Sequence, residues 1–206
     1  MGRLTCLLIP LLVACRASEQ PAITGGPIII ISIDTLRSDR LPAYGYKGIE
    51  TPHIDALGRD AILFERAYTE CPLTLVAHAS LFTGRLPAEH GIHDNIGYSL
   101  GTNARTLAEE LKRKGYATGG AVSAIVLRGE TGMKRGFDFY DDAVDIDPHS
   151  LSMGRAQRSG DETREVAERW ISGQGRSPFF FFLHYLLLLL LLLPLPLLLL
   201  LISSQT

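Results

Sequence analysis

The chain has 206 residues, enough for one sizeable domain with a buried core. Its 20 basic and 22 acidic residues give a formal net charge of −2, which argues against a nucleic-acid-binding surface. No glycine-rich loop of the P-loop or dinucleotide-binding type stands out. Length, composition and charge therefore predict a globular domain without a nucleic-acid partner.

Residues 1–15 have the pattern of an export signal. Arg3 supplies a positive charge, and the apolar run that follows is too short to cross a bilayer as a helix. The segment Leu-Val-Ala-Cys that ends at Cys15 resembles a bacterial lipobox, which implies a lipid on Cys15. The alternative is an ordinary secretory signal with an incidental cysteine. Residues 16–26 are small and polar and suit a tether. We expect an exported protein, held by this lipid at a membrane of the bacterial periplasm or cell envelope.

The globular domain is expected over residues 27–185, and it begins with an apolar, β-branched run over residues 28–33. Such a run predicts a buried parallel strand, with Asp34 at its carboxyl end. Ligands of α/β proteins bind at the carboxyl ends of strands, where a carboxylate suits a hard divalent cation. The alternative is that Asp34 only caps the following turn.

Two local elements are expected next. Thr51-Pro52 opens a helix that extends to about Arg59, since proline is favoured in the first turn of a helix. Residues 61–68 are then expected to form a short strand that leads into a turn at Pro72.

A short helix is predicted to follow Pro72, with Thr74 as its N-cap and Gly84 as its stop. A hydroxyl at this position lies among unpaired N–H groups that stabilise anions. It therefore suits an oxygen nucleophile that attacks phosphorus or sulfur; the alternative is that Thr74 is only a cap. His78 lies one helical turn later and either holds a substrate oxygen or is a hydrogen-bonded structural residue.

The rest of the domain alternates between helices and strands. In order, we expect a helix over 103–114 capped by Asn103, a strand over 116–126, a loop-rich stretch over 128–160, a helix over 161–171 capped by Asp161, and a buried strand over 177–185 that ends near His184. This βαβ order predicts an α/β fold with a mostly parallel central sheet and helices on both faces, a three-layer α/β/α sandwich.

Residues 186–206 form a leucine-rich, low-complexity tail. The run from 186 to 201 is leucine apart from Pro194 and Pro196, and its length is marginal for crossing a bilayer. One interpretation is a frame slip or premature end just after Tyr185. The other is a C-terminal membrane anchor.

Several blocks of the sequence, taken together and in order, resemble the sulfatase family of the alkaline phosphatase superfamily. The matching blocks are residues 33–41, 44–46, 51–57, 81–91, 106–118 and 136–138. The resemblance covers about residues 27–185, which correspond to the N-terminal part of the family. It implies an alkaline-phosphatase-like fold that is C-terminally incomplete here. It also implies hydrolysis of sulfate or phosphate esters of small molecules, glycans or lipids, with a divalent cation (calcium, magnesium, zinc or manganese).

The chain departs from the family at the nucleophile. Typical sulfatases carry Cys-x-Pro-Ser-Arg, whose cysteine becomes formylglycine nine residues before the Thr that matches Thr83. Thr74 stands at that position, His78 stands at the position of the Arg, and Cys71 lies three residues too early. A threonine nucleophile is more similar to the phosphodiesterase and phosphotransferase branches of the superfamily.

The departures also affect the groups around the nucleophile. The family's paired acids match Ile33 and Asp34, so one acid is present, and its Lys and His fall near Ser123 and Ile125. The resemblance then implies that Asp34 and Thr74 contact the metal. It also implies that Thr74 attacks the ester, while His78 and His184 steady the developing oxyanion.

Three hypotheses follow. The first is an exported, lipid-anchored sulfatase-family hydrolase with a metal-activated Thr74. The second is a truncated, non-catalytic remnant, and the third is a membrane-anchored transferase of the phosphoethanolamine type. The sequence does not indicate an oligomeric state.

Overall fold

The computed structural model describes residues 25–144 and 158–186. The expected signal over 1–15 with Cys15, nearly all of the tether, and the leucine-rich tail beyond Leu186 lie outside the described residues. No helix in the described ranges is long and apolar enough to cross a membrane.

The centre of the fold is a four-stranded sheet in the order β1-β4-β2-β3, and every strand pair is parallel. The strands are β1 (Ile28–Asp34), β2 (Ala117–Val122), β3 (Phe139–Asp141) and β4 (Phe179–Leu186). β4 lies between β1 and β2, so its residues pair on both sides. β1 was expected to be buried, but all of its residues are half-buried because it pairs on one side only within the described sheet.

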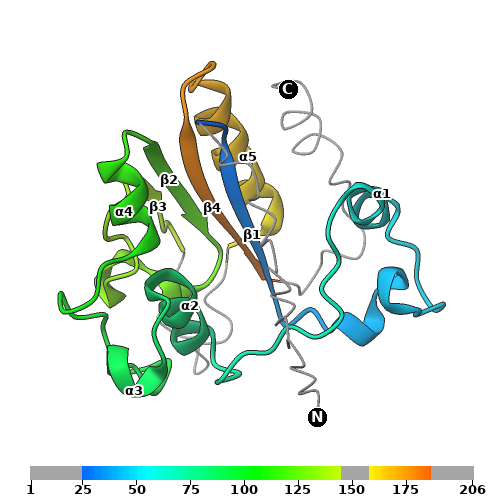
Figure 1. Ribbon diagram of the computed structural model, residues 1–206, viewed down its shortest axis with the longest axis horizontal. Helices are drawn as coiled ribbons and strands as arrows, with labels where there is room; N and C mark the ends of the chain where they lie inside the picture. Colours follow the sequence, from blue (N-terminus) through cyan, green and yellow to red (C-terminus); the bar gives the residue numbers. More distant parts are fainter. Residues whose placement is uncertain (1–24, 145–157, 187–206) are drawn as a thin grey trace, which may run out of the picture.

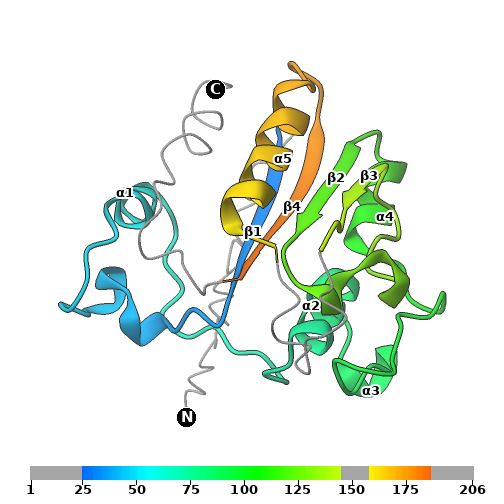
Figure 2. The same ribbon diagram turned by 180° about the vertical axis from the view of Figure 1, so that it is seen from behind.

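Helices cover both faces of the sheet, which confirms the predicted three-layer α/β/α arrangement. Helices α2 (Thr74–Thr83) and α4 (Leu107–Arg113) lie on one face and α5 (Gly160–Ser172) on the other (Figures 1 and 2). Alternate residues of β4 pack against the two helical layers, because successive side chains of a strand point to opposite faces. Phe180 and Phe182 join the core beneath α2 and α4, whereas Phe179 and Phe181 join the core beneath α5.

Shorter elements connect these layers. They are the helices α1 (Pro52–Asp60) and α3 (Pro87–His90) and the 3₁₀ turns η1 (Ser38–Arg40), η2 (Pro42–Tyr44), η3 (Ile125–Leu127) and η4 (Gly129–Thr131). The α1 helix was predicted from Thr51-Pro52, and Pro52 is its first residue.

Two helices begin at residues other than those expected. Helix α4 is capped by Thr106 rather than Asn103, and α5 is capped by Ser159 rather than Asp161. In both, the cap hydroxyl accepts a backbone N–H while the glutamate three residues later accepts the N–H of the cap residue. This reciprocal capping box satisfies two otherwise unpaired donors, and neither Asn103 nor Asp161 has a glutamate or glutamine three residues later to complete one.

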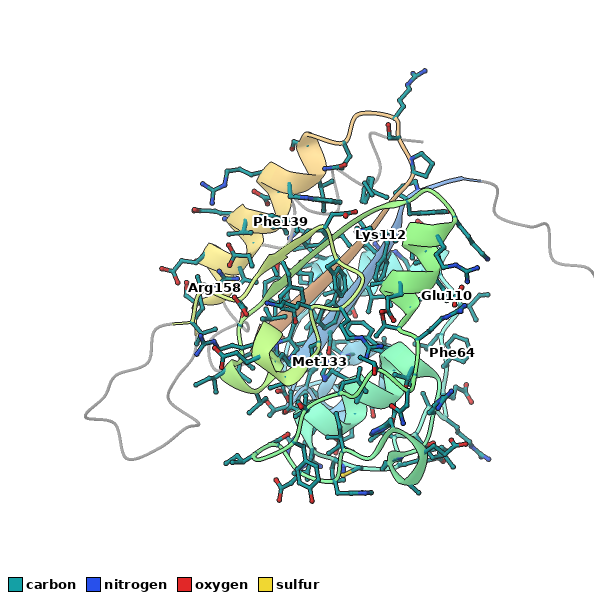
Figure 3. The ribbon with its side chains drawn as sticks, turned by 90° about the vertical axis from the view of Figure 1, so that its left-hand side faces the viewer. Phe64, Glu110, Lys112, Met133, Phe139 and Arg158 are labelled. Atoms are coloured by element: carbon teal, nitrogen blue, oxygen red, sulfur yellow. The ribbon has the colours of Figure 1, made fainter. Side chains whose placement is uncertain are left out.

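Two strand predictions were wrong. Residues 61–68 form no strand; they run across the surface, and Phe64 is exposed. β3 lies inside the stretch that was expected to be a loop. Its last residue, Asp141, forms an ion pair with Arg158, which lies just before α5 and is labelled in Figure 3.

Candidate active site

The candidate site lies where the carboxyl ends of β1 and β4 meet the N-terminus of α2. Asp34 is the last residue of β1, His184 lies near the end of β4, and Thr74 is the first residue of α2. The parallel register brings the two strand ends together, since Ser32 is paired with His184 and Asp34 with Leu186. Residues that are distant in the sequence therefore converge at the edge where α/β proteins bind ligands.

Thr74 and Asp34 are in direct contact. The Thr74 hydroxyl donates a 2.9 Å hydrogen bond to Oδ2 of Asp34. Thr74 was expected to be the N-cap of its helix, but Leu73 occupies that position and makes no side-chain cap. The Thr74 hydroxyl, one residue inside the helix, is therefore turned to the carboxylate instead of a backbone N–H.

Asn95 supplies the cap that Leu73 cannot. The backbone N–H of Leu75 donates a 2.9 Å hydrogen bond to Oδ1 of Asn95. This contact satisfies one of the free donors of the helix and fixes its first turn. Asn95 was not predicted for this role, because the contact spans 20 residues and the sequence shows only a polar turn there.

His184 is fully buried, and neither of its ring nitrogens has a hydrogen-bond partner among the described residues. Its Nε2 lies 3.6 Å from Oδ2 of Asp34, which is too far for a good hydrogen bond. Buried polar atoms without partners are uncommon and costly, and they are often explained by a catalytic role or a bound ion. The position of His184 beside Asp34 fits such a role.

His78 lies beside Thr74 as expected, but both of its nitrogens are already used. Nδ1 is 2.7 Å from the backbone carbonyl oxygen of Thr74, and Nε2 is 2.8 Å from Oγ of Ser32. A carbonyl oxygen only accepts, so Nδ1 carries a proton. Burial, followed by the neighbouring His184, lowers the pKa of His78 to about 4, so the ring is neutral near pH 7 and Nε2 accepts from Ser32. This arrangement fits the structural alternative for His78 and leaves no nitrogen for a substrate oxygen.

Ser32 was not predicted as a site residue. Its signal in the sequence is weak: a lone hydroxyl in an apolar run, two residues before Asp34 and hence on the same face of β1.

Asp34 is held as a carboxylate. The neighbouring His184 lowers the pKa of Asp34 below its ordinary value, partial burial acts in the opposite direction, and the hydrogen bond from Thr74 lowers it further. The group is therefore ionised at neutral pH. It can accept from a hydroxyl or bind a cation.

The donors around Asp34 fit part of the coordination shell of a divalent cation. The Asp34 carboxylate and the Thr74 hydroxyl are oxygen donors of the kind that hard cations prefer, and the unpaired His184 nitrogens are beside them. No group of three or more His, Cys, Asp or Glu residues within 25–144 and 158–186 is placed to hold a metal ion. These residues therefore supply one carboxylate of such a site rather than a complete set.

Ser123 and Ile125, which stand where the sulfatase pattern has a Lys and a His, have structural contacts instead of charged groups. Ser123 is buried and shares a 2.7 Å hydrogen bond with Thr163 of α5, and Ile125 begins η3. Neither residue provides a charged group to the site.

Most of the described chain is similar to known proteins. A family model described as Sulfatase matches residues 27–186. An arylsulfatase of Clostridium perfringens is 35% identical over 94 residues, which cover 44% of this chain and 19% of that protein. The steryl-sulfatase of Mus musculus is 32% identical over 118 residues, which cover 52% of this chain and 19% of that protein. The matched part thus spans about a fifth of the length of these relatives.

Solved structures share the fold. A 2-O GAG sulfatase superposes with a TM-score of 0.62 at 23% identity, covering 79% of this chain and 35% of the other. A phosphonate monoester hydrolase of Agrobacterium radiobacter gives a TM-score of 0.59 at 23% identity, covering 78% of this chain and 40% of the other. At these identities the likeness establishes an alkaline-phosphatase-like fold, as expected from the sequence.

Proposed function

The chain belongs to the sulfatase family, and from this premise we propose that it hydrolyses sulfate or phosphate esters through the Thr74 hydroxyl. The observation that carries the proposal is the 2.9 Å hydrogen bond from this hydroxyl to an ionised Asp34 at the start of α2. A hydroxyl becomes a useful nucleophile when a neighbouring group or a metal assists its deprotonation.

The reaction has two balanced steps. Thr74 Oγ bonds to the sulfur or phosphorus of the ester while the bond to the alcohol oxygen breaks. The hydroxyl proton is released to water and the departing alcohol takes up a proton from water, while Asp34 stays ionised. Water then attacks the ester on Thr74, which restores the hydroxyl and releases sulfate or phosphate.

A divalent cation is part of this proposal, and members of the sulfatase family generally use a metal ion. Asp34 and Thr74 would hold it in this chain, and calcium, magnesium, zinc and manganese are the candidates. When bound, such a cation makes a hydroxyl more acidic and stabilises developing negative charge. The low pKa of Asp34 keeps the carboxylate available as a ligand at neutral pH.

His184 is proposed to steady the transferred group. Its nitrogens have no hydrogen-bond partner among the described residues, and the ring lies beside Asp34 near the end of β4. An N–H from this ring, together with free N–H groups in the first turn of α2, would face the oxygens that become negatively charged. His78 instead supports the backbone of Thr74, because both of its nitrogens are occupied.

The proposed substrates are sulfate or phosphate esters of a small molecule, a glycan or a lipid. The similar proteins include sulfatases named for aryl and steryl substrates and a phosphonate monoester hydrolase, so neighbours of this fold act at both sulfur and phosphorus. A threonine in place of the formylglycine precursor supports including phosphate esters for this chain.

Export is also proposed, from the signal pattern over residues 1–15. Mass spectrometry of the N-terminal peptide of the protein made in a bacterial host is expected to show a lipid on Cys15. A Cys15→Ala chain is expected to lack the lipid and to leave the membrane fraction. An unmodified Cys15 in the membrane fraction would contradict lipid anchoring.

The first experiment compares wild type with Thr74→Ala and Thr74→Ser. Each protein is given p-nitrophenyl sulfate or p-nitrophenyl phosphate with each candidate cation, and again with a chelator. Wild type is expected to release p-nitrophenol only with a cation. Thr74→Ser should retain part of the activity, whereas Thr74→Ala should lose it with an unchanged circular dichroism spectrum. Folded proteins that all fail to release p-nitrophenol would instead support the non-catalytic remnant, which the single carboxylate of the site favours.

A further inference from the structure

We propose that Ser32 is a positioning residue that acts through His78 to hold Thr74 against Asp34. This inference rests on the proposed role of Thr74 and goes beyond it, because the Ser32 hydroxyl is bonded to His78 rather than to either of the groups proposed to react.

The first observation is a continuous chain of hydrogen bonds. Ser32 Oγ is 2.8 Å from Nε2 of His78, and Nδ1 of the same ring is 2.7 Å from the carbonyl oxygen of Thr74. The imidazole thus connects a side chain of β1 to the backbone of the residue whose hydroxyl would react.

The second observation is that this series of hydrogen bonds runs beside the direct contact between Thr74 and Asp34. Ser32 and Asp34 are two residues apart and lie on the same face of β1, while Thr74 and His78 lie one turn apart on α2. β1 and α2 are therefore joined twice, by Asp34 with Thr74 and by Ser32 with His78. Two contacts fix the rotation of the helix end relative to the strand, whereas one would allow it to pivot.

The third observation is that the imidazole has little room to turn. His78 is 7% exposed, and its ring packs edge-on against His184 and Phe182, with centroids 5.1 Å and 5.7 Å away. Removal of the Ser32 hydroxyl would leave Nε2 buried without this partner. Because the packed ring has little room to reach another partner, this cost would be relieved by a shift of the ring together with the start of α2, which moves Thr74 relative to Asp34.

The same helix provides a matched control. Ser80 Oγ lies 3.0 Å from Nε2 of His90, and His90 is also buried. This second serine–histidine pair resembles the first in chemistry and burial but lies toward the other end of α2. Ser80→Ala therefore removes a comparable hydrogen bond without touching the link between Ser32 and Thr74.

The test compares Ser32→Ala, Ser32→Thr and Ser80→Ala with wild type in two measurements. The first is hydrolysis of p-nitrophenyl phosphate and p-nitrophenyl sulfate with a divalent cation. Ser32→Ala is expected to lower kcat by roughly 10- to 100-fold with little change in KM, because a small misplacement of a reacting group has effects of this size. Ser32→Thr keeps the hydroxyl and should restore kcat, and Ser80→Ala should match wild type.

The second measurement needs no turnover. Three-bond couplings in NMR spectra report whether the side chain of Thr74 occupies one rotamer or several. We expect one rotamer in wild type, Ser32→Thr and Ser80→Ala, and averaging in Ser32→Ala.

The two measurements separate the possible failures. If wild type cleaves neither ester, the proposed function fails, yet the Thr74 rotamer still tests the positioning role. If Thr74 stays in one rotamer in Ser32→Ala, or averages equally in Ser80→Ala, the inference is overturned. Should Ser32→Ala fail to fold, Ser32→Cys, which retains a weak donor of similar size, is measured in its place. The Thr74 side chain is then expected to show intermediate rotamer averaging. A single Thr74 rotamer in Ser32→Cys would contradict the positioning role.

Discussion

β4 and β1 are neighbouring strands that both end at the candidate site, yet they differ in how they are held. β4 is buried along all but its last residue and pairs on both sides, whereas every residue of β1 is half-buried and the strand pairs on one side in the described sheet. His184 is thus fixed by a dense core on both faces. Asp34 is positioned by the ladder between β1 and β4 on one side and by side-chain hydrogen bonds between β1 and α2.

The difference indicates two ways of placing a functional group. A buried central strand positions a side chain through packing, which tolerates an unpaired imidazole because the surrounding contacts are many. A strand at the edge needs specific polar contacts to do the same. We expect substitutions in β4 to act mainly on stability, and polar substitutions in β1 to act mainly on the geometry of the site.

The largest expected effect compares Phe182→Ala with Ile30→Ala. These residues are register partners that join the same core, but Phe182 is fully buried and Ile30 is half-buried. Phe182→Ala should lower the free energy of unfolding by about 3–5 kcal/mol, and Ile30→Ala by roughly 1–2 kcal/mol. Urea denaturation of the two variants measures the difference. Equal losses would show that the two strands are held alike.

His78 contacts both strands, through a hydrogen bond to Ser32 of β1 and ring packing against Phe182 and His184 of β4. Its pKa is lowered from about 6.5 in the unfolded chain to about 4 in the fold, mainly by burial. Between these values the unfolded chain binds more protons, so the free energy of unfolding should fall as the pH drops from 6.5 to 4. The loss attributable to His78 is at most about 3 kcal/mol.

Urea denaturation at several pH values measures this loss, and His78→Gln, which does not titrate, is the control. The variant should show a shallower pH dependence between pH 4 and 6.5. The rest of the slope comes from other groups, including His90, whose pKa burial also lowers. The same slope in wild type and His78→Gln would contradict the burial of a neutral His78.

The smallest expected effect is at His184. The buried imidazole has no hydrogen-bond partner among the described residues, so an apolar side chain of similar size removes the cost of burying unsatisfied polar atoms. His184→Leu should therefore raise the free energy of unfolding by about 1 kcal/mol. Hydrolysis should fall in the same variant, because the group proposed to face the oxyanion is gone. A loss of stability would show that the imidazole has a partner that stabilises the fold.

The sequence allowed prediction of elements whose signals are local. The apolar run before Asp34, the proline of α1, and the stop at Gly84 each depend on neighbouring residues, and each was found close to its expected place. The alternation of helices and strands gave the layers, the pattern after Pro72 singled out Thr74, and the family resemblance added the type of reaction. These features explain why the fold could be expected in outline.

Features that depend on distant partners were missed. Residues 61–68 have strand-like composition, but no strand within 25–144 and 158–186 lies beside them to complete a ladder. β3 is only three residues long and exists because it pairs with β2. The link from Ser32 to His78 spans 46 residues, so no local pattern could reveal it or show that His78 is occupied.

The most direct test of the account is whether the transferred group becomes attached to Thr74. Wild type is mixed with p-nitrophenyl phosphate or p-nitrophenyl sulfate and a divalent cation, stopped rapidly with acid, digested and measured by mass spectrometry. The account predicts a phosphate or sulfate ester on Thr74, present only with the cation and absent from Thr74→Ala. Release of p-nitrophenol without modification of Thr74, or at an equal rate in Thr74→Ala, would contradict it.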